Sequence, residues 1–154
     1  MKALKIIGIV FIVLVVGLFI FSKSMGVMPL SFGMHQSIYQ SDGIAVGGYD
    51  VVAYHQDSAA IKGDAQYSTK WQEIDWHFSS AENLALFKMT PEKFAPIGGG
   101  YCAFAVSKGF TAPSDGKYWK LVDGDLLLFS NEDVMKESEA GMENISKEAK
   151  SKFK

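Results

Sequence analysis

The only thiol in this 154-residue chain belongs to Cys102. A thiolate is a nucleophile and a soft metal ligand, and a nearby imidazole can serve as its base or as a second ligand. His77 and His55 lie in the central part of the same sequence. We therefore predict that Cys102, His77 and His55 are metal ligands.

Three successive glycines and a tyrosine directly precede this thiol. Exposed backbone N–H groups beside a cysteine can hold a ligand, and a tyrosine adds a ring and a hydroxyl. We therefore predict that this turn binds a ligand through Gly99, Gly100 and Tyr101.

Each of these residues also has a purely structural interpretation. Cys102 stands beside Phe104 and Val106 in an expected strand over 101–106, where a lone cysteine is often a small core residue. His77 either lies exposed on its strand or lines a pocket. His55 is either a ligand or a solvated histidine at the end of an element. The sequence leaves these alternatives open.

The elements around these residues are short, and local signals mark their ends. Two hairpins are predicted, over 67–78 with a turn at Gln72-Glu73, and over 118–129 with a turn at Asp123-Gly124. A helix over 80–89 is capped by Ser79 or Ser80, and another begins after Ser130 or Asn131. Asp50 caps or turns the chain before 51–54, which is a strand or a short helix. The predicted class is α+β, with a small antiparallel sheet of hairpins packed on short helices.

Three segments carry a resemblance to a known family. They are Gly47-Gly48-Tyr49-Asp50-Val51-Val52-Ala53-Tyr54, the stretch from Trp76 to Pro96 with its Phe-Ser-Ser turn, and Gly99-Gly100-Tyr101-Cys102-Ala103. Together they resemble the YHS domain family, and within it a cysteine-poor subgroup of bacterial proteins that are membrane-anchored or secreted. The resemblance implies a treble-clef-like domain over about residues 44–134.

The chain departs from the metal-handling members of that family, which are found beside copper-transporting pumps. Those members carry cysteines near the first strand and in the strand-to-helix turn. Here the turn has Ser79 and Asn83, and the first segment has Val52 and Ala53. The usual ligand set is therefore missing, and a copper ion is only the first guess for a cofactor.

Composition limits the possible partners. Net charge is −2 and the isoelectric point is about 5.9, which argues against nucleic acid because phosphate binding needs a basic surface. One cysteine excludes an internal disulfide and an all-cysteine zinc site within one chain.

The N-terminal region is predicted to be a signal anchor, residues 1–24. An apolar run over 6–21 follows Lys2 and Lys5, and no Ala-x-Ala-like cleavage site comes after it. A cleaved signal peptide is the alternative. By the positive-inside rule the two lysines hold the N-terminus in the cytoplasm, so the domain faces the periplasm or outside of a single-pass protein.

The remaining segments are predicted to be appendages. Residues 25–43 are expected to form a linker, whose methionines and His35 are either ordinary juxtamembrane residues or a landing site for a soft metal. Residues 135–154 are expected to form a charged, frayed helical tail.

Three functions follow from these features. The first is a membrane-anchored binding module that holds a metal or small ligand near Cys102 and His77 and serves a transport or respiratory system. The second is a metal-free docking module with Tyr49, Trp76 and Trp119 as anchors. The third, a cysteine-dependent enzyme, has only Cys102 and His77 to use, because the sequence contains no phosphate loop or metalloprotease motif.

The predicted orientation can be tested with a reporter fused after Gly43. Alkaline phosphatase should be active there, because the lysines before the apolar run keep the N-terminus inside. An inactive phosphatase, together with an active cytoplasmic reporter at the same position, would reverse the orientation.

Overall fold

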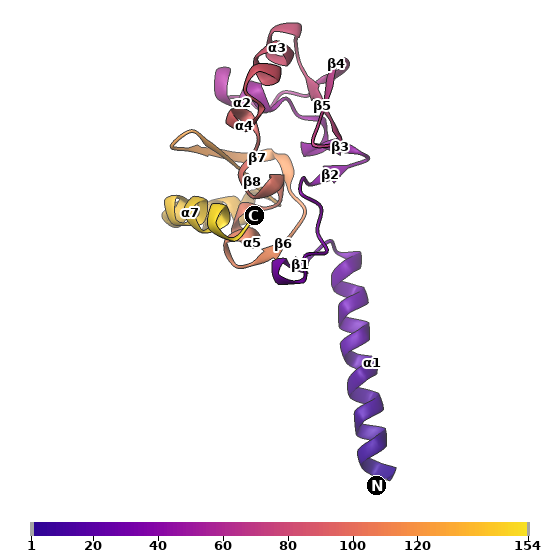
Figure 1. Ribbon diagram of the computed structural model, residues 1–154. Helices are drawn as coiled ribbons and strands as arrows, with labels where there is room; N and C mark the ends of the chain where they lie inside the picture. The colour runs from indigo at the N-terminus through magenta and orange to yellow at the C-terminus, as the bar shows by residue number, and fades with distance from the viewer. Residues whose placement is uncertain (1, 154) are drawn as a thin grey trace.

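The structure is a computed structural model that describes residues 2–153, and side chains from residue 7 onward. Lys2 and Lys5, on which the predicted orientation rests, therefore lie outside the described side chains. One long helix, α1 (Lys2–Ser24), projects from a compact body in which small sheets and short helices are mixed (Figure 1). The α+β class and the separate N-terminal apolar helix are confirmed.

The helices of the body are α2 (Val51–Gln56), α3 (Ala81–Met89), α4 (Pro91–Phe94), α5 (Ala103–Ser107), α6 (Glu132–Glu137) and α7 (Met142–Lys152), with 3-10 turns η1 (Leu30–Phe32), η2 (Val46–Gly48), η3 (Ile97–Gly100) and η4 (Glu139–Gly141). The strands are β1 (Met28–Pro29), β2 (Gln40–Ser41), β3 (Ile44–Ala45), β4 (Asp64–Trp71), β5 (Ile74–Phe78), β6 (Phe110–Thr111), β7 (Asp115–Val122) and β8 (Asp125–Phe129).

The helix α1 is exposed along its apolar length. Residues 7–24 are long and apolar enough to cross a membrane, a property that a signal sequence near an N-terminus shares.

The first sheet has the strand order β2-β3-β5-β4. The hairpin β4–β5 turns at Gln72 and Glu73, which both have positive φ, as the turn that matches the strand twist requires. The pairing of β3 with β5 is parallel, so this sheet is mixed rather than wholly antiparallel as predicted.

The helix α3 covers the buried face of this sheet. Ser80 accepts a hydrogen bond from the backbone N–H of Asn83, which confirms the predicted cap. The ring of Phe87 packs against Trp76 and Phe78, with centroids 5.1 and 4.9 Å away. These three side chains are buried, and Leu84 and Leu86 are partly buried against them.

The strand β8 divides the interior into two apolar clusters. Leu126 and Leu128 point into the cluster that α3 covers, while Leu127 and Phe129 point into a second cluster beneath α5 and α7. Both faces of β8 are therefore buried, which explains its unbroken apolar sequence. Its hairpin with β7 turns at Asp123 and Gly124, as predicted.

The strand predicted over 101–106 is wrong. Cys102 is the N-cap residue of α5, and its strand-like contact is one isolated bridge to Leu128. The alternation of apolar residues in so short a segment fits one helical turn as well as a strand, and the sequence could not decide between them. Phe104 consequently packs in the second cluster, where it is partly buried.

The segment over 25–43 is packed against the body, although a free linker was predicted. β1 pairs with β6, β2 pairs with β3, and the side chains of Met28 and Ile38 are buried. Its strands β1 and β2 have two residues each and are too short to show a period.

The C-terminal tail is helical as predicted, but it is packed on the body and not frayed. α7 packs on α5, and Ile145 and Ala149 are buried with Phe153 beside them. These residues recur every four positions and form one apolar stripe. The surrounding lysines and glutamates obscured that stripe in the sequence.

Candidate functional site

A buried carboxylate joins two of the motifs that the sequence singled out. Asp50 is 0% exposed and forms the N-cap of α2, where its Oδ1 accepts hydrogen bonds from the N–H groups of Val52 and Ala53, at 2.9 and 3.3 Å. The predicted capping role of Asp50, and the helical alternative for 51–54, are thereby confirmed.

The other oxygen of Asp50 reaches the turn between β5 and α3. Oδ2 accepts from the Ser79 N–H at 2.8 Å, the Ser79 hydroxyl at 2.6 Å and the Asn83 side-chain amide at 2.8 Å. Neutral donors therefore satisfy both oxygens of a buried charge. Ser79 and Asn83 are the positions at which the family resemblance would place thiols, and in this chain their hydroxyl and amide donate to the Asp50 carboxylate.

Cys102 lies in the second apolar cluster. Its side chain is 2% exposed and packs with Leu127, Phe129 and Ile145. Within residues 7–153 no hydrogen bond links it to His77 or His55. The structure thus gives the thiol the surroundings of a core residue.

The two predicted histidine ligands lie on separate elements. His77 is half-buried on the face of β5 opposite Trp76, beside Gly48, where an added Cβ would be 3.9 Å from its Nδ1. His55 ends α2 with its ring edge-on to Phe94, at 5.4 Å between centroids. Burial, and secondly the charge of Lys93, lower the pKa of His55.

The described residues contain no group of three or more His, Cys, Asp or Glu side chains that could hold a metal ion. The buried Nε2 of His55 also has no hydrogen-bond partner among them. The structure therefore does not bring Cys102, His77 and His55 together into a ligand set of that size.

The glycine turn before Cys102 allows the chain to pass close to the segment over 37–39. Gly98, Gly99 and Gly100 are all buried. A Cβ on Gly99 would lie 2.3 Å from the carbonyl oxygen of Ser37, and the Gly99 carbonyl accepts from the N–H of Tyr39 at 2.7 Å. Little of this turn is open to a ligand, but Tyr101 borders a cavity, as described below.

The predicted docking anchors are packed in the domain. Tyr49 and Trp76 are buried, and Trp119 is half-buried with its ring 5.0 Å from that of Tyr54. Little of the Tyr49 and Trp76 side chains is therefore exposed.

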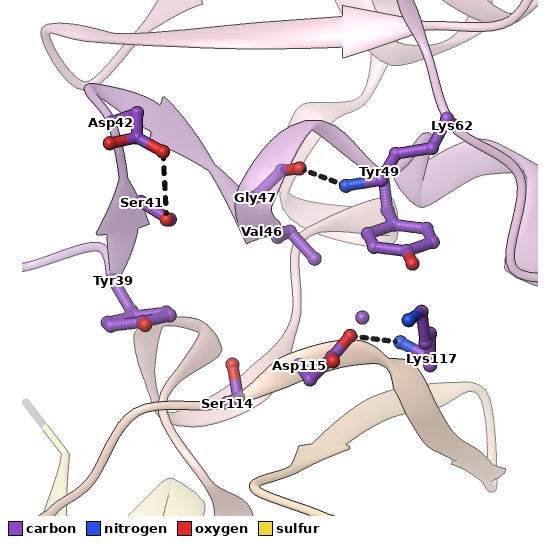
Figure 2. A pocket seen from close by; sticks show the side chains of 11 residues that line it. Tyr39, Ser41, Asp42, Val46, Gly47, Tyr49, Lys62, Ser114, Asp115 and Lys117 are labelled. Atoms are coloured by element: carbon purple, nitrogen blue, oxygen red, sulfur yellow. Dashed lines mark hydrogen bonds between the residues drawn. The ribbon is translucent and has the colours of Figure 1, made fainter.

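A polar cavity of about 370 Å³ opens between the segment around η2 and the start of β7. Its walls come from residues 39–49, from Lys62 and from the start of β7, and we call it the tyrosine cavity. Figure 2 shows Tyr39, Ser41 and Asp42 on one side and Tyr49, Lys62 and Lys117 on the other, with Ser114 and Asp115 between them.

Charges of both signs face this cavity without pairing. No ion pair among the described residues involves Asp42, Asp115, Lys62 or Lys117. The Lys62 ammonium lies 3.9 Å from the centre of the Tyr49 ring and donates to the carbonyl of Gly47 at 2.6 Å. Both signs therefore remain available to an occupant.

The two cavity phenols are neutral at physiological pH. Burial, then the carboxylates of Asp115 and Asp42, raise the pKa of Tyr39. Burial and Asp115 likewise raise the pKa of Tyr49, against a lowering by Lys117. Both hydroxyls can therefore donate as well as accept hydrogen bonds.

The floor of the tyrosine cavity depends on Gly116. A Cβ there would lie 2.3 Å from the Tyr49 ring, and the buried hydroxyl of Tyr54 donates to the Gly116 carbonyl at 2.7 Å. Sequence reasoning did not identify this cavity, because nothing local relates residues 39–49 to 114–117.

A second cavity, of about 250 Å³, lies beside the end of α1. Its lining includes Met28, Met34, His35 and Tyr101, together with Lys23 from α1. The rings of His35 and Tyr101 are 6.4 Å apart, edge to face. We call this space the juxtamembrane cavity. Its lining includes Tyr101, which was predicted to bind a ligand. It also includes Met28 and Met34, two of the methionines for which a soft-metal landing site was one of the two interpretations.

Comparisons with known protein families, curated proteins and solved structures found no match to this chain. The YHS resemblance rests on the motifs quoted above, and the treble-clef identity stays a prediction.

Replacing Asp50 with asparagine should destabilise the domain by about 1–3 kcal/mol, because an amide NH₂ would then face donors that now share a carboxylate oxygen. Urea unfolding of the full chain in detergent, followed by tryptophan fluorescence, measures the loss. The matched control is Asp57→Asn, an exposed aspartate at the other end of α2, which should change stability by less than about 0.5 kcal/mol. Equal effects would refute the importance of the network.

Proposed function

We propose that this chain is a membrane-anchored, non-enzymatic binding protein whose extracytoplasmic domain holds a small zwitterionic ligand in the tyrosine cavity. In this proposal α1 remains in the membrane as a single-pass anchor, and the domain presents the ligand to a membrane transport or respiratory system.

The arrangement of charge in the cavity carries this proposal. Asp42 and the Tyr39 hydroxyl line one side, Lys62 and Lys117 line the opposite side, and Asp115 lies between them (Figure 2). A ligand with an ammonium group and a carboxylate can meet both signs at once. A ligand with only one charge leaves the opposite side without a partner, so the cavity favours a zwitterion.

The test is thermal unfolding of the full chain with a panel of the free amino acids and two dipeptides. A ligand at 100 times its Kd should stabilise the domain by about 2.7 kcal/mol. The matching monopolar compounds, an alkylamine and a carboxylic acid of the same size, should not. Asp115→Asn and Lys117→Gln should each remove the effect, and the exposed β4 residue change Lys70→Gln should not.

If no zwitterion stabilises the parent chain, or if Lys70→Gln removes the effect as fully as Lys117→Gln, the proposal of a ligand in this cavity fails.

A copper site in the juxtamembrane cavity is the second candidate. The thioethers of Met28 and Met34 and the imidazole of His35 line one small space, and these donors suit copper(I). This arrangement favours copper there over the predicted set of Cys102, His77 and His55.

Competition with a chromophoric copper(I) chelator separates the two copper hypotheses. Binding in the juxtamembrane cavity should be lost in His35→Gln and kept in His55→Gln, and native-state alkylation of Cys102 should be slow with or without copper. Rapid alkylation that copper blocks would instead support Cys102 as the ligand. No copper binding would refute both.

A further inference from the structure

The exposed apolar side chains of the body gather at one end. Outside α1, the large apolar residues that the structure leaves exposed among those it describes are Met25, Phe32, Met34, Met89 and Phe110. All except Met89 lie in the segment directly after α1 or in β6, which pairs with that segment. A group of this kind indicates an interaction surface.

The connection between α1 and this surface is short and hydrogen-bonded. The N–H of Val27 donates to the carbonyl of Ser22, and that of Gly26 donates to Lys23, both at 3.1 Å. With Gly26 at φ 68°, these bonds form a Schellman ending of the helix. β1 begins at Met28, directly after Val27, so no flexible segment separates the body from the end of α1.

Phe110 is held beside the same segment. The Thr111 hydroxyl bonds to both the N–H and the carbonyl of Met28, at 3.2 and 3.3 Å, and Pro29 pairs with Phe110. The N–H of Leu30 donates to the carbonyl of Gly109 at 2.9 Å. β1 and β6 consequently lie next to the upper end of α1, while α3 lies at the far end of the body (Figure 1).

Phe32 reaches back along the apolar helix. Its ring centroid is 6.5 Å from that of Phe19, which lies roughly 7 Å along the axis from the last residue of α1 at the usual helical rise. If residues 7–24 cross a bilayer, Phe32 lies at the depth of residues inside the span.

We propose that Met25, Phe32, Met34 and Phe110 form a membrane-seating surface that inserts into the phospholipid leaflet around the C-terminal end of α1. Phenylalanine is among the apolar residues that interfacial helices bury at the boundary between headgroups and acyl chains. The exposed Lys23 and Lys108 each stand two residues before a member of this surface, Met25 and Phe110, and in this proposal their ammonium groups lie among the headgroups. The proposal rests on the proposed membrane anchor but not on any ligand.

The seating surface also fixes where the juxtamembrane cavity lies. Lys23 and Met34 contribute to both, so the cavity opens at the headgroup level of the bilayer, whereas the tyrosine cavity is farther along the body.

Nitroxide labels in the full chain test the seating. The chain carries Leu14→Cys, Phe32→Cys, Phe110→Cys or Met89→Cys and is reconstituted in vesicles of phosphatidylethanolamine and phosphatidylglycerol. Collisions of each label with oxygen, which concentrates in lipid, are compared with collisions with a water-soluble nickel chelate. The oxygen-to-nickel ratio at 32 and 110 should be several-fold higher than at 89 and should approach that at 14.

Met89 is the matched control because it is the most exposed apolar side chain of the body, at 72%, against 55% for Phe32 and 44% for Phe110. The parent chain, with only the buried Cys102, gives the background. If a substitution at 32 or 110 shifts the urea midpoint, Met34→Cys repeats the measurement.

The outcomes separate the two proposals. Ratios at 32 and 110 equal to that at 89, with position 14 in lipid, overturn the seating surface while the anchor stands. A water-exposed label at 14 overturns both.

Discussion

The buried carboxylate of Asp50 is the constraint on which the arrangement of the domain depends. A charge without solvent is tolerated only when hydrogen bonds surround it, and here the donors come from two places. Val52 and Ala53 are its neighbours in sequence, whereas Ser79 and Asn83 are 29 and 33 residues away. The start of α2 and the start of α3 must therefore meet at Asp50, and this meeting sets the position of the turn that carries Tyr49 to the cavity wall.

The second half of the domain is placed by packing and sterics. Each face of β8 packs in one of the two apolar clusters, so the two clusters share this buried strand. Separating them would expose leucines on both faces of β8 to water, which is unfavourable. Gly116 then brings β7 against Tyr49, at a distance that any side chain would prevent, and the Tyr54 hydroxyl bonds to its carbonyl. The tyrosine cavity is thus bounded by one segment that a charge network fixes and another that close backbone contact fixes.

The elements that sequence reasoning predicted correctly carry their signal within a few residues. Ser80 and Asn131 cap helices through their own side chains, and Asp123-Gly124 closes a hairpin. One failure is local: the strand predicted at Cys102 is the start of a helix, because so short an apolar segment fits either element. The others involve partners far along the chain, as for α7, which is ordered because α5 covers its apolar stripe. The cavity was missed for the same reason, since residues 39–49 and 114–117 of its lining are more than sixty positions apart in the sequence.

Tyr39 connects the two cavities, because its side chain lines both of them. On the juxtamembrane side its ring packs on that of Tyr101, with centroids 5.3 Å apart. On the other side burial, and then the carboxylates of Asp115 and Asp42, raise the pKa of its hydroxyl. An occupant that moves this ring from one side changes the wall of the opposite cavity, and linkage requires the effect to be reciprocal. Tyr39 also follows Ile38, whose side chain is buried in the first cluster, and its own N–H donates to the Gly99 carbonyl. The fold therefore places one aromatic side chain in the walls of both cavities, the one beside α1 and the one farther along the body.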